Sequence, residues 1–176
     1  LKAFKRKGMH KEGDVHGGFQ GEIDKVWDEL DTQLSVLEDR KIHVTGHSLG
    51  AAMATICAKR LSLEHENVHC LYTFGSPRVG NRKWCKTHKV PHYRYQNNND
   101  MVCKVPFWMM GFKHHGTNVY INYKGRVVKL RWWRRMIDSM RGRLRALLKF
   151  QLFDGIYDHN ISTYAERLKD VVLDSK

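Results

Sequence analysis

The stretch Ile42-His43-Val44-Thr45-Gly46-His47-Ser48-Leu49-Gly50 carries the strongest structural signal in this 176-residue sequence. Its first four residues are strand-like, and a helical run, 51–58, follows it directly. The pattern G-x-S-x-G between a strand and a helix is typical of a sharp turn that exposes its serine at the edge of a sheet. The small glycines on either side let the strand and the helix approach closely. We therefore predict that Ser48 is a nucleophile rather than part of an ordinary glycine-rich turn.

A serine hydroxyl needs a base, usually histidine, and a carboxylate that orients the base. In one large class of serine hydrolases these residues follow in the order serine, acid, histidine. Asp100 follows three asparagines that are typical of a loop, and His159 lies just before a helical stretch, 161–172. We predict Asp100 as the acid and His159 as the base, although an Asx-turn aspartate and a helix-start histidine have the same sequence signature.

These motifs belong to a longer series that resembles the class 3 lipases, the fungal-lipase-like branch of the α/β-hydrolases. The matching segments keep the order of that family and span nearly the whole chain: 15–19, 44–52, 73–81, 99–106, 111–116, and Asp158-His159 with Tyr164. The resemblance implies Ser48 as nucleophile, Asp100 as acid and His159 as base. It also implies that the backbone N–H of Leu49 donates to an oxyanion. His16 and His114 match family positions other than the base, so we expect them to organise loops.

The expected fold class is α/β, an α/β-hydrolase fold with a mostly parallel central sheet flanked by helices. Helical patterns cover 19–39, 49–63, 81–88 and 130–150, and strand patterns cover 42–45, 68–74, 91–96 and 119–123. Residues 1–14 are polar and are expected to form a loop. The family has an Arg-Gly-Thr-like segment upstream that donates part of the oxyanion hole, and residues 1–14 contain nothing like it. We therefore expect one domain, 1–176, that is N-terminally incomplete and lacks its N-terminal strands.

Positive charge is concentrated near the C-terminal end of the sequence. The chain has 31 Lys and Arg against 18 Asp and Glu, and residues 124–149 hold much of the excess with one acid, Asp138. The predicted helix 130–150 repeats apolar residues every three to four positions, with arginines between them. Such a helix suits an anionic membrane surface, but a helix packed on the domain with a solvated basic face has the same pattern. No RNA-binding motif is present, so no specific nucleic acid partner is expected. The sequence does not indicate the oligomeric state.

The apolar segment 105–112 lies next to the predicted acid loop. It is either a buried loop that packs into the core, or an exposed segment that forms a wall for acyl chains or an interfacial patch. We predict that Phe107 and Trp108, together with His47, contact the substrate.

The four cysteines show no zinc-binding spacing, and the proposed chemistry requires no metal or cofactor. Free thiols are favoured over two disulfides, which indicates a reducing compartment and a cytoplasmic or peripheral-membrane location.

The leading functional hypothesis is a serine carboxylester hydrolase that cleaves lipid esters through an acyl-enzyme intermediate. Triacylglycerol, phospholipid and short soluble esters are all open as substrates. The alternative is a catalytically inactive hydrolase-fold module that binds anionic lipid surfaces through its basic helix.

Overall fold

The structure is a computed structural model that describes residues 5–7, 13–36, 40–64, 67–148 and 158–173. The strands are β1 Lys5–Lys7, β2 Asp14–His16, β3 Ile42–His47, β4 Val68–Phe74, β5 His92–Asn97, β6 Thr117–Ile121 and β7 Val127–Val128. The helices are α1 Gly17–Ser35, α2 Leu49–Glu64, α3 Arg82–Thr87, α4 Trp132–Leu148 and α6 Ile161–Leu173, with short 3-10 turns at Val102–Lys104 and Trp108–Met110.

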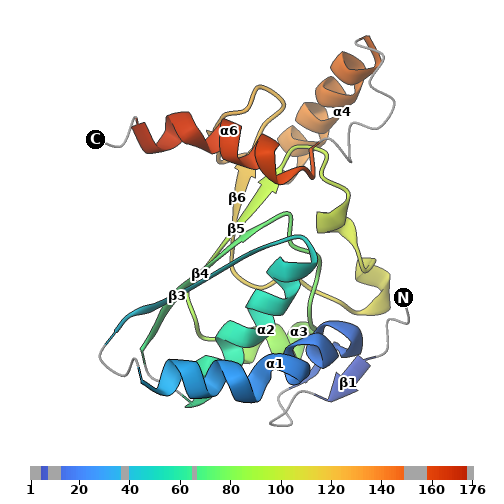
Figure 1. Ribbon diagram of the computed structural model, residues 1–176. Helices are drawn as coiled ribbons and strands as arrows, with labels where there is room; N and C mark the ends of the chain where they lie inside the picture. Colours follow the sequence, from blue (N-terminus) through green and yellow to red (C-terminus); the bar gives the residue numbers. More distant parts are fainter. Residues whose placement is uncertain (1–4, 8–12, 37–39, 65–66, 149–157, 174–176) are drawn as a thin grey trace.

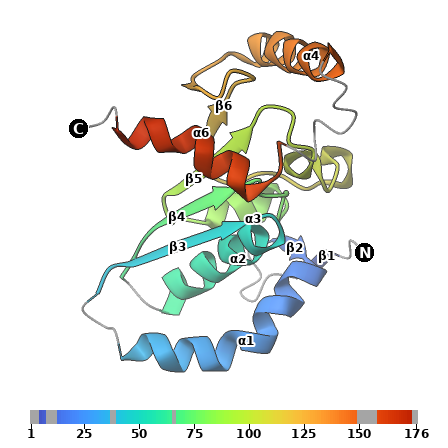
Figure 2. The ribbon, with the colours of Figure 1, turned by 45° about the horizontal axis from the view of Figure 1, so that its top comes forward.

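A five-stranded sheet in the order β3-β4-β5-β6-β7 organises the described part of the chain. The pairs β3–β4, β4–β5 and β5–β6 are parallel, and β7 returns antiparallel to β6. Helices α1, α2 and α3 lie on one side of this sheet and α6 lies on the other, as Figures 1 and 2 show. The mostly parallel sheet flanked by helices is the α/β-hydrolase architecture predicted from the sequence. Since parallel strands end at the same edge, the loops after β3, β4 and β5 gather there.

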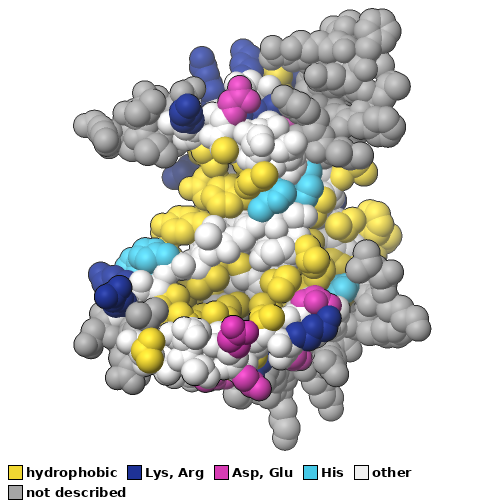
Figure 3. Space-filling model, in the orientation of Figure 1, with side chains coloured by type: hydrophobic (Ala, Val, Ile, Leu, Met, Phe, Trp, Pro, Cys, Tyr) yellow, Lys and Arg dark blue, Asp and Glu magenta, His cyan; other side chains and the backbone are white. Residues whose placement is uncertain are grey.

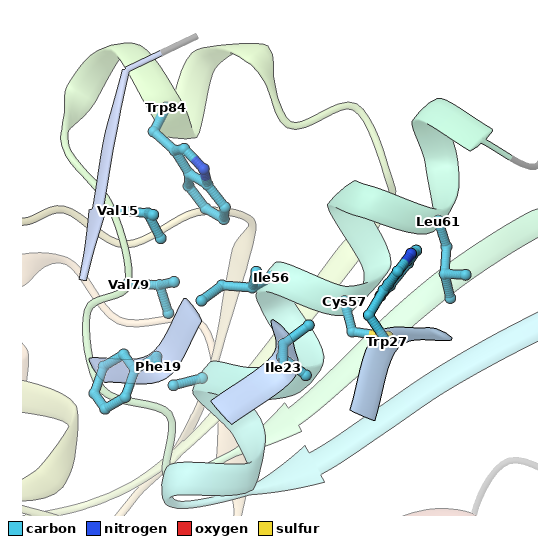
Figure 4. Close-up of a cluster of buried hydrophobic side chains, with 10 residues drawn as sticks. Val15, Phe19, Ile23, Trp27, Ile56, Cys57, Leu61, Val79 and Trp84 are labelled. Atoms are coloured by element: carbon cyan, nitrogen blue, oxygen red, sulfur yellow. The ribbon is translucent and has the colours of Figure 1, made fainter. Parts of the chain in front are cut away.

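The main core lies between α1, α2 and the loop that carries α3 (Figure 4). Phe19, Ile23 and Trp27 recur at helical spacing on α1 and are buried against Ile56 and Leu61 of α2. Each buried side chain of this size contributes about 1.5–3 kcal/mol through the hydrophobic effect. This packing fixes α2, and with it the turn that joins α2 to β3.

The opposite face of the sheet carries stacked aromatic side chains. Tyr72 stacks on Tyr93 with ring centroids 5.4 Å apart, and Phe74 stacks on Tyr95 at 5.0 Å. Tyr164 of α6 meets the edge of Phe74, so α6 covers the carboxyl end of this face. Figure 3 shows hydrophobic side chains gathered across the middle of the molecule, between α6 and α1.

The structure corrects several predicted boundaries. Residues 1–14 were expected to form a loop, but Lys5–Lys7 pairs antiparallel with Asp14–His16 as a small ribbon. Short edge strands tolerate charged residues well, so the polarity of this segment misled the prediction. The last predicted strand begins two residues early, at Thr117, and the short partner β7 was missed. The ends of two predicted helices, 37–39 and 149–150, lie outside the described residues.

The four cysteines are free thiols, and three of them, Cys57, Cys70 and Cys103, are buried. Within the part of the chain that the structure describes, no helix is both long and apolar enough to cross a membrane.

Candidate active site

The turn between β3 and α2 holds Ser48 in an unusual backbone conformation. Ser48 has φ 57°, in the left-handed region, and its N–H donates to the Phe74 carbonyl at 3.0 Å. A Cβ atom added at Gly46 would lie 2.4 Å from the carbonyl oxygen of Gly50, so the close approach of strand and helix requires glycine there. A non-glycine residue in this region is strained, and such strain is typical of functional positions.

Three side chains from distant parts of the sequence meet above this turn. The Nε2 atom of His159 lies 2.8 Å from the Oγ atom of Ser48. The Nδ1 atom of His159 lies 3.0 Å from each carboxylate oxygen of Asp100, which is fully buried. Since a carboxylate accepts, Nδ1 carries the proton and Nε2 is left to accept the hydrogen bond of the serine hydroxyl. The structure thus brings together all three residues of the predicted triad.

The carboxylate of Asp100 is held by two further donors. The backbone N–H of Val102 donates to Oδ1 at 2.9 Å, and the hydroxyl of Tyr164 donates to Oδ2 at 2.6 Å. The Tyr164 oxygen in turn accepts from the N–H of Asn97 at 2.9 Å. Burial raises the pKa of Tyr164 far above its usual value, so this hydroxyl stays protonated and remains a donor.

Gly75, directly after β4, lies next to both Asp100 and His159. Its φ is +60°, and an added Cβ would lie 2.8 Å from both Asp100 Oδ2 and His159 Nδ1. Contacts this short do not occur between real atoms of these types. Glycine is therefore required both by the backbone conformation and by the space that the pair occupies.

A buried aspartate ties the loop of the base to the loop of the acid. Asp158, 1% exposed, accepts from Asn98 Nδ2 at 3.2 Å and from the backbone N–H of Asn99 at 3.0 Å. Its backbone carbonyl accepts from Asn97 Nδ2 at 2.9 Å, and Arg167 of α6 pairs with its carboxylate at 3.2 Å. Because Asn99 precedes Asp100 and Asp158 precedes His159, this network sets the distance between acid and base.

His47, predicted as a substrate contact, lies against the back of the base. Its Nε2–H donates to the backbone carbonyl of His159 at 2.7 Å, and the two rings stack with centroids 4.7 Å apart. Tyr164 meets the His47 ring edge-on at 6.0 Å. These contacts orient the base, and contact of His47 with a substrate stays a prediction.

Phe107 and Trp108 lie in a loop whose apolar side chains face solvent. Phe107 is 60% exposed, Trp108 62% and Met109 76%, so the buried-loop interpretation is wrong for this part of the segment, whereas Phe112 at its end is buried. The loop is fixed by Arg78, whose guanidinium donates to the carbonyls of Lys104 and Pro106. An exposed apolar loop beside the acid is compatible with the predicted substrate contact, which the structure leaves as a prediction.

The two histidines expected to organise loops lie outside the triad. His114 donates from Nε2 to the Cys103 carbonyl at 2.8 Å, and burial lowers its pKa to about 3, so it is neutral. His16 is buried beside Phe19, with ring centroids 4.0 Å apart, at the start of α1. Neither contacts Ser48.

Leu49 is the first residue of α2, so its N–H has no acceptor within the helix and lies at the positive end of the helix dipole. This position suits the predicted oxyanion donor. No second donor is identified among the described residues.

Three residues of the site were not assigned roles from the sequence: Gly75, Asp158 and Tyr164. All three lie in segments that carry the resemblance to the class 3 lipases, but their contacts are with residues far away in the sequence. Their roles become visible only when the ends of β4 and β5 and the start of α6 are placed together.

Comparisons with known proteins show the family of this chain. The family model described as lipase (class 3) matches residues 2–110. A lipase from Rhizomucor miehei is 35% identical over 118 residues, covering 61% of this chain and 32% of the relative. The toxin TseL of Vibrio cholerae is 33% identical over 120 residues, covering 66% of this chain and 19% of the relative. The chain thus spans a third or less of these curated relatives.

Solved structures show the same likeness. The triacylglyceride lipase of Rhizomucor miehei superimposes with a TM-score of 0.63 at 31% identity, covering 69% of this chain and 50% of that one. Mono- and diacylglycerol lipase from Aspergillus oryzae gives a TM-score of 0.63 at 30% identity, covering 68% and 47%. A triacylglycerol lipase whose catalytic centre is described as a serine protease triad gives 0.62 at 32% identity, covering 69% and 50%.

Proposed function

The chain belongs to the class 3 lipase family, and we propose that it hydrolyses lipid esters with Ser48, His159 and Asp100 as its catalytic triad. The observation that carries this proposal is the continuous hydrogen-bond chain from Ser48 Oγ through both ring nitrogens of His159 to the buried carboxylate of Asp100. A histidine and a serine that merely filled a loop would not need the strained turn at Ser48 or the support around Asp100.

In the proposed mechanism, Ser48 Oγ attacks the ester carbonyl carbon while His159 Nε2 takes the hydroxyl proton. Asp100 holds the imidazole in the required tautomer and stabilises the imidazolium that forms. The N–H of Leu49 donates to the oxyanion of the tetrahedral intermediate. His159 then gives its proton to the departing alcohol, which leaves an acyl-enzyme on Ser48. A water molecule, activated by His159, releases the carboxylic acid and restores the serine.

We propose an acylglycerol as the substrate, because several relatives at 30% identity or more are described as lipases or as mono- and diacylglycerol lipases. The exposed apolar side chains of Phe107, Trp108 and Met109 beside the acid loop suit a substrate with long acyl chains. A phospholipid remains the second candidate, favoured by the concentration of arginine in α4.

We further propose that α4 places the protein on an anionic lipid surface. The helix packs on the body through a polar face: Asp138 accepts from Tyr120 OH at 2.8 Å, and Asn99 Nδ2 donates to the Ser139 carbonyl at 3.2 Å. Gly142 faces the same way, since an added Cβ there would lie 2.3 Å from Asn98 Nδ2. Close packing therefore accounts for this glycine.

The apolar stripe of α4 consequently faces solvent. Its exposed members recur at positions i, i+3, i+4 and i+7 and are 40–66% exposed: Trp133, Met136, Ile137 and Met140. Exposed arginines flank the stripe at positions 131, 134 and 141. A helix that packs by its polar face and exposes an apolar stripe between cations is typical of binding at a lipid interface. This arrangement supports the membrane interpretation over a stripe packed in the core.

A fluorophosphonate probe with mass-spectrometric reading of the adduct tests the proposed hydrolase. We expect stoichiometric labelling at Ser48 that is lost in His159→Ala and strongly slowed in Asp100→Asn. His114→Gln serves as the control histidine, because it lies outside the triad and should retain labelling if folded. No labelling of the folded wild-type protein would overturn the hydrolase proposal and leave the surface-binding module as the better account. If the wild-type protein reacts with the probe, its rates of hydrolysis on acylglycerol and phospholipid emulsions then separate the two substrate classes.

A further inference from the structure

Two histidines and a cysteine lie together on β3 and β4, away from the triad. The donor atoms of His43, His69 and Cys70 all lie within 4.8 Å of one another. The Sγ atom of Cys70 is 3.1 Å from the Nδ1 atom of His43, and the rings of His43 and His69 have centroids 5.0 Å apart. Among the described residues this is the one such group of three potential metal ligands.

An irregularity in the pairing of β3 with β4 creates the cluster. Ile42 pairs with Val68 and His43 pairs with Cys70, so His69 is an extra residue on β4. In a regular strand, neighbouring residues such as His69 and Cys70 would point to opposite faces of the sheet. The extra residue makes two residues oppose one and turns both toward His43. The sequence shows no metal-binding spacing because these donors meet only through this pairing.

We propose that His43, His69 and Cys70 form a zinc-binding site. A thiolate and two imidazoles are the donors that Zn²⁺ prefers, and the cluster contains no carboxylate of the kind that Mg²⁺ or Ca²⁺ requires. His43 and His69 are exposed, so an ion reaches the site without unfolding, whereas Cys70 is only 4% exposed. Three protein ligands leave the fourth tetrahedral position for water or another ligand.

Binding requires little rearrangement of the cluster. Zn–S and Zn–N bonds of about 2.3 and 2.1 Å in a tetrahedron place sulfur and nitrogen about 3.6 Å apart. The present Cys70–His43 distance of 3.1 Å is close to this value, and the paired strands already fix both backbones. On binding, the Cys70 thiol releases its proton to solvent, and the sulfur and both imidazoles donate electron pairs to the metal.

The site has no part in the proposed hydrolysis. His43 precedes His47 by four residues of one strand, which corresponds to about 13 Å along β3. Zinc would instead tie β3 to β4 at the end of the sheet opposite the triad. Its expected effect is therefore on stability, independent of the activity proposed for Ser48.

Zinc binding to the purified, chelator-treated protein tests the site directly. We expect one zinc per chain after desalting, and a cobalt-substituted protein with a sulfur-to-metal charge-transfer absorption band. At a zinc concentration a hundredfold above Kd, we expect Tm to rise by about 5 °C or more. Cys70→Ser should abolish the cobalt band, and His43→Gln and His69→Gln should each weaken binding at least about tenfold. Cys85→Ser, at a thiol outside the cluster, should bind as the wild type does.

His69→Gln separates loss of a metal ligand from loss of folding, because this exposed residue can be replaced without disturbing the core. Absence of retained zinc in the folded wild-type protein would overturn the proposal. Equal binding by wild type and Cys70→Ser would also overturn it, by placing the metal at other residues. Fluorophosphonate labelling of Ser48 should be the same with and without zinc, so failure of this proposal is distinguishable from failure of the proposed hydrolase.

Discussion

The Tyr164 hydroxyl donates a 2.6 Å hydrogen bond to the Oδ2 atom of Asp100, although the two residues are 64 positions apart in the sequence. Both side chains are buried, so water cannot replace the bond. Tyr164 thereby links the first turn of α6 to the acid of the proposed triad. A hydrogen bond to a buried charged group of this kind contributes about 1.5–3 kcal/mol.

Replacing Tyr164 with Phe removes that bond and leaves the ring. We expect the free energy of unfolding to fall by about 1.5–3 kcal/mol and kcat to fall on the order of tenfold, with KM little changed. Urea denaturation and ester hydrolysis measure the two effects. Tyr93→Phe is the matched control, since Tyr93 is 41% exposed on the sheet face and should change neither quantity. An unchanged kcat in Tyr164→Phe would show that the Val102 N–H alone is enough to hold Asp100.

Gly75→Ala places a methyl group where Asp100 and His159 meet. The added carbon overlaps both partners at 2.8 Å, and an alanine at φ +60° adds about 1–2 kcal/mol of backbone strain. We expect activity and fluorophosphonate labelling to fall at least about a hundredfold, since the base loses its orientation. Gly21→Ala in α1 is the control, because nothing lies within 4 Å of its added Cβ. If Gly75→Ala labels at the wild-type rate, the close contact in the site has no catalytic consequence.

Asp158→Asn tests the link between the acid and base loops. The amide keeps the size of the carboxylate but opposes its NH₂ group to the donors of Asn98 and Asn99. It also removes the charge that pairs with Arg167, which keeps its hydrogen bond to Asn97 Oδ1. We expect a loss of about 3 kcal/mol in the free energy of unfolding, at the low end for a buried pair because Arg167 is partly exposed.

Asp24→Asn is the control for Asp158→Asn, because the Asp24 carboxylate is exposed and its ion pair with Arg60 should contribute about 0–1 kcal/mol. Equal effects of the two substitutions on urea midpoints would argue against the role of Asp158.

Buried histidines predict a steep loss of stability in mild acid. Burial lowers the pKa of His88 to about 3, of His92 to about 2 and of His114 to about 3. The folded protein keeps them neutral, whereas the unfolded chain binds protons below about pH 6.5. Their contribution to stability is therefore complete above pH 6.5 and is lost progressively as the pH falls towards 3. Each histidine adds up to about 1.4 kcal/mol per pH unit to this slope.

Urea unfolding at several pH values between 7.5 and 4.5 measures that slope. We expect His88→Gln to be less stable at pH 7 but to lose less stability per pH unit than the wild type. A wild-type free energy of unfolding that stays constant from pH 7 to pH 5 would contradict the buried, neutral state of these residues.

The exposed stripe of α4 predicts which substitutions weaken binding to lipid. We expect the double variant Met136→Ser and Met140→Ser to bind anionic phospholipid vesicles about tenfold more weakly, through loss of buried apolar area. Replacing the flanking arginines at 131, 134 and 141 with Gln should cost about 1 kcal/mol each and reduce the salt dependence.

Val26→Ser with Val36→Ser is the matched control for the α4 variants, since Val26 on α1 and Val36 directly after α1 are both exposed. Vesicle co-sedimentation measures all of these effects. Equal binding by the α4 variants and the α1 control would remove α4 from the lipid contact.

The long elements of the fold were predictable because their patterns are local. The helices around Ile23 and Ala54 and the strand Val68–Phe74 agree with apolar spacing within a few residues. The strands β1 and β7 were not predictable, because pairing with a neighbour and not residue type creates such short strands. The meeting of Ser48, Asp100 and His159 follows the order that the motifs indicated, and their catalytic roles stay predictions.

The sequence does not indicate whether a given face of a helix or strand points to the core or to solvent. The stripe of α4 is equally good as a core face or a lipid face, and only the contacts of Asp138 and Gly142 show that another face of the helix packs on the body. The same limit applies to His69, whose neighbour Cys70 would be assigned to the opposite face by simple alternation. In each case a contact between distant segments overrides a correct local pattern.

Helix α4 contacts Asn98 and Asn99 with one face, and these residues immediately precede the proposed acid. If the other face attaches to lipid as proposed, that attachment and the alignment of Asp100 are linked equilibria. If the aligned loop of Asp100 holds α4 in the orientation that binds lipid best, then lipid binding must favour the aligned loop by the same factor. The fraction of molecules with an aligned triad would then differ between the free and the lipid-bound protein, with no change in any residue that touches the substrate.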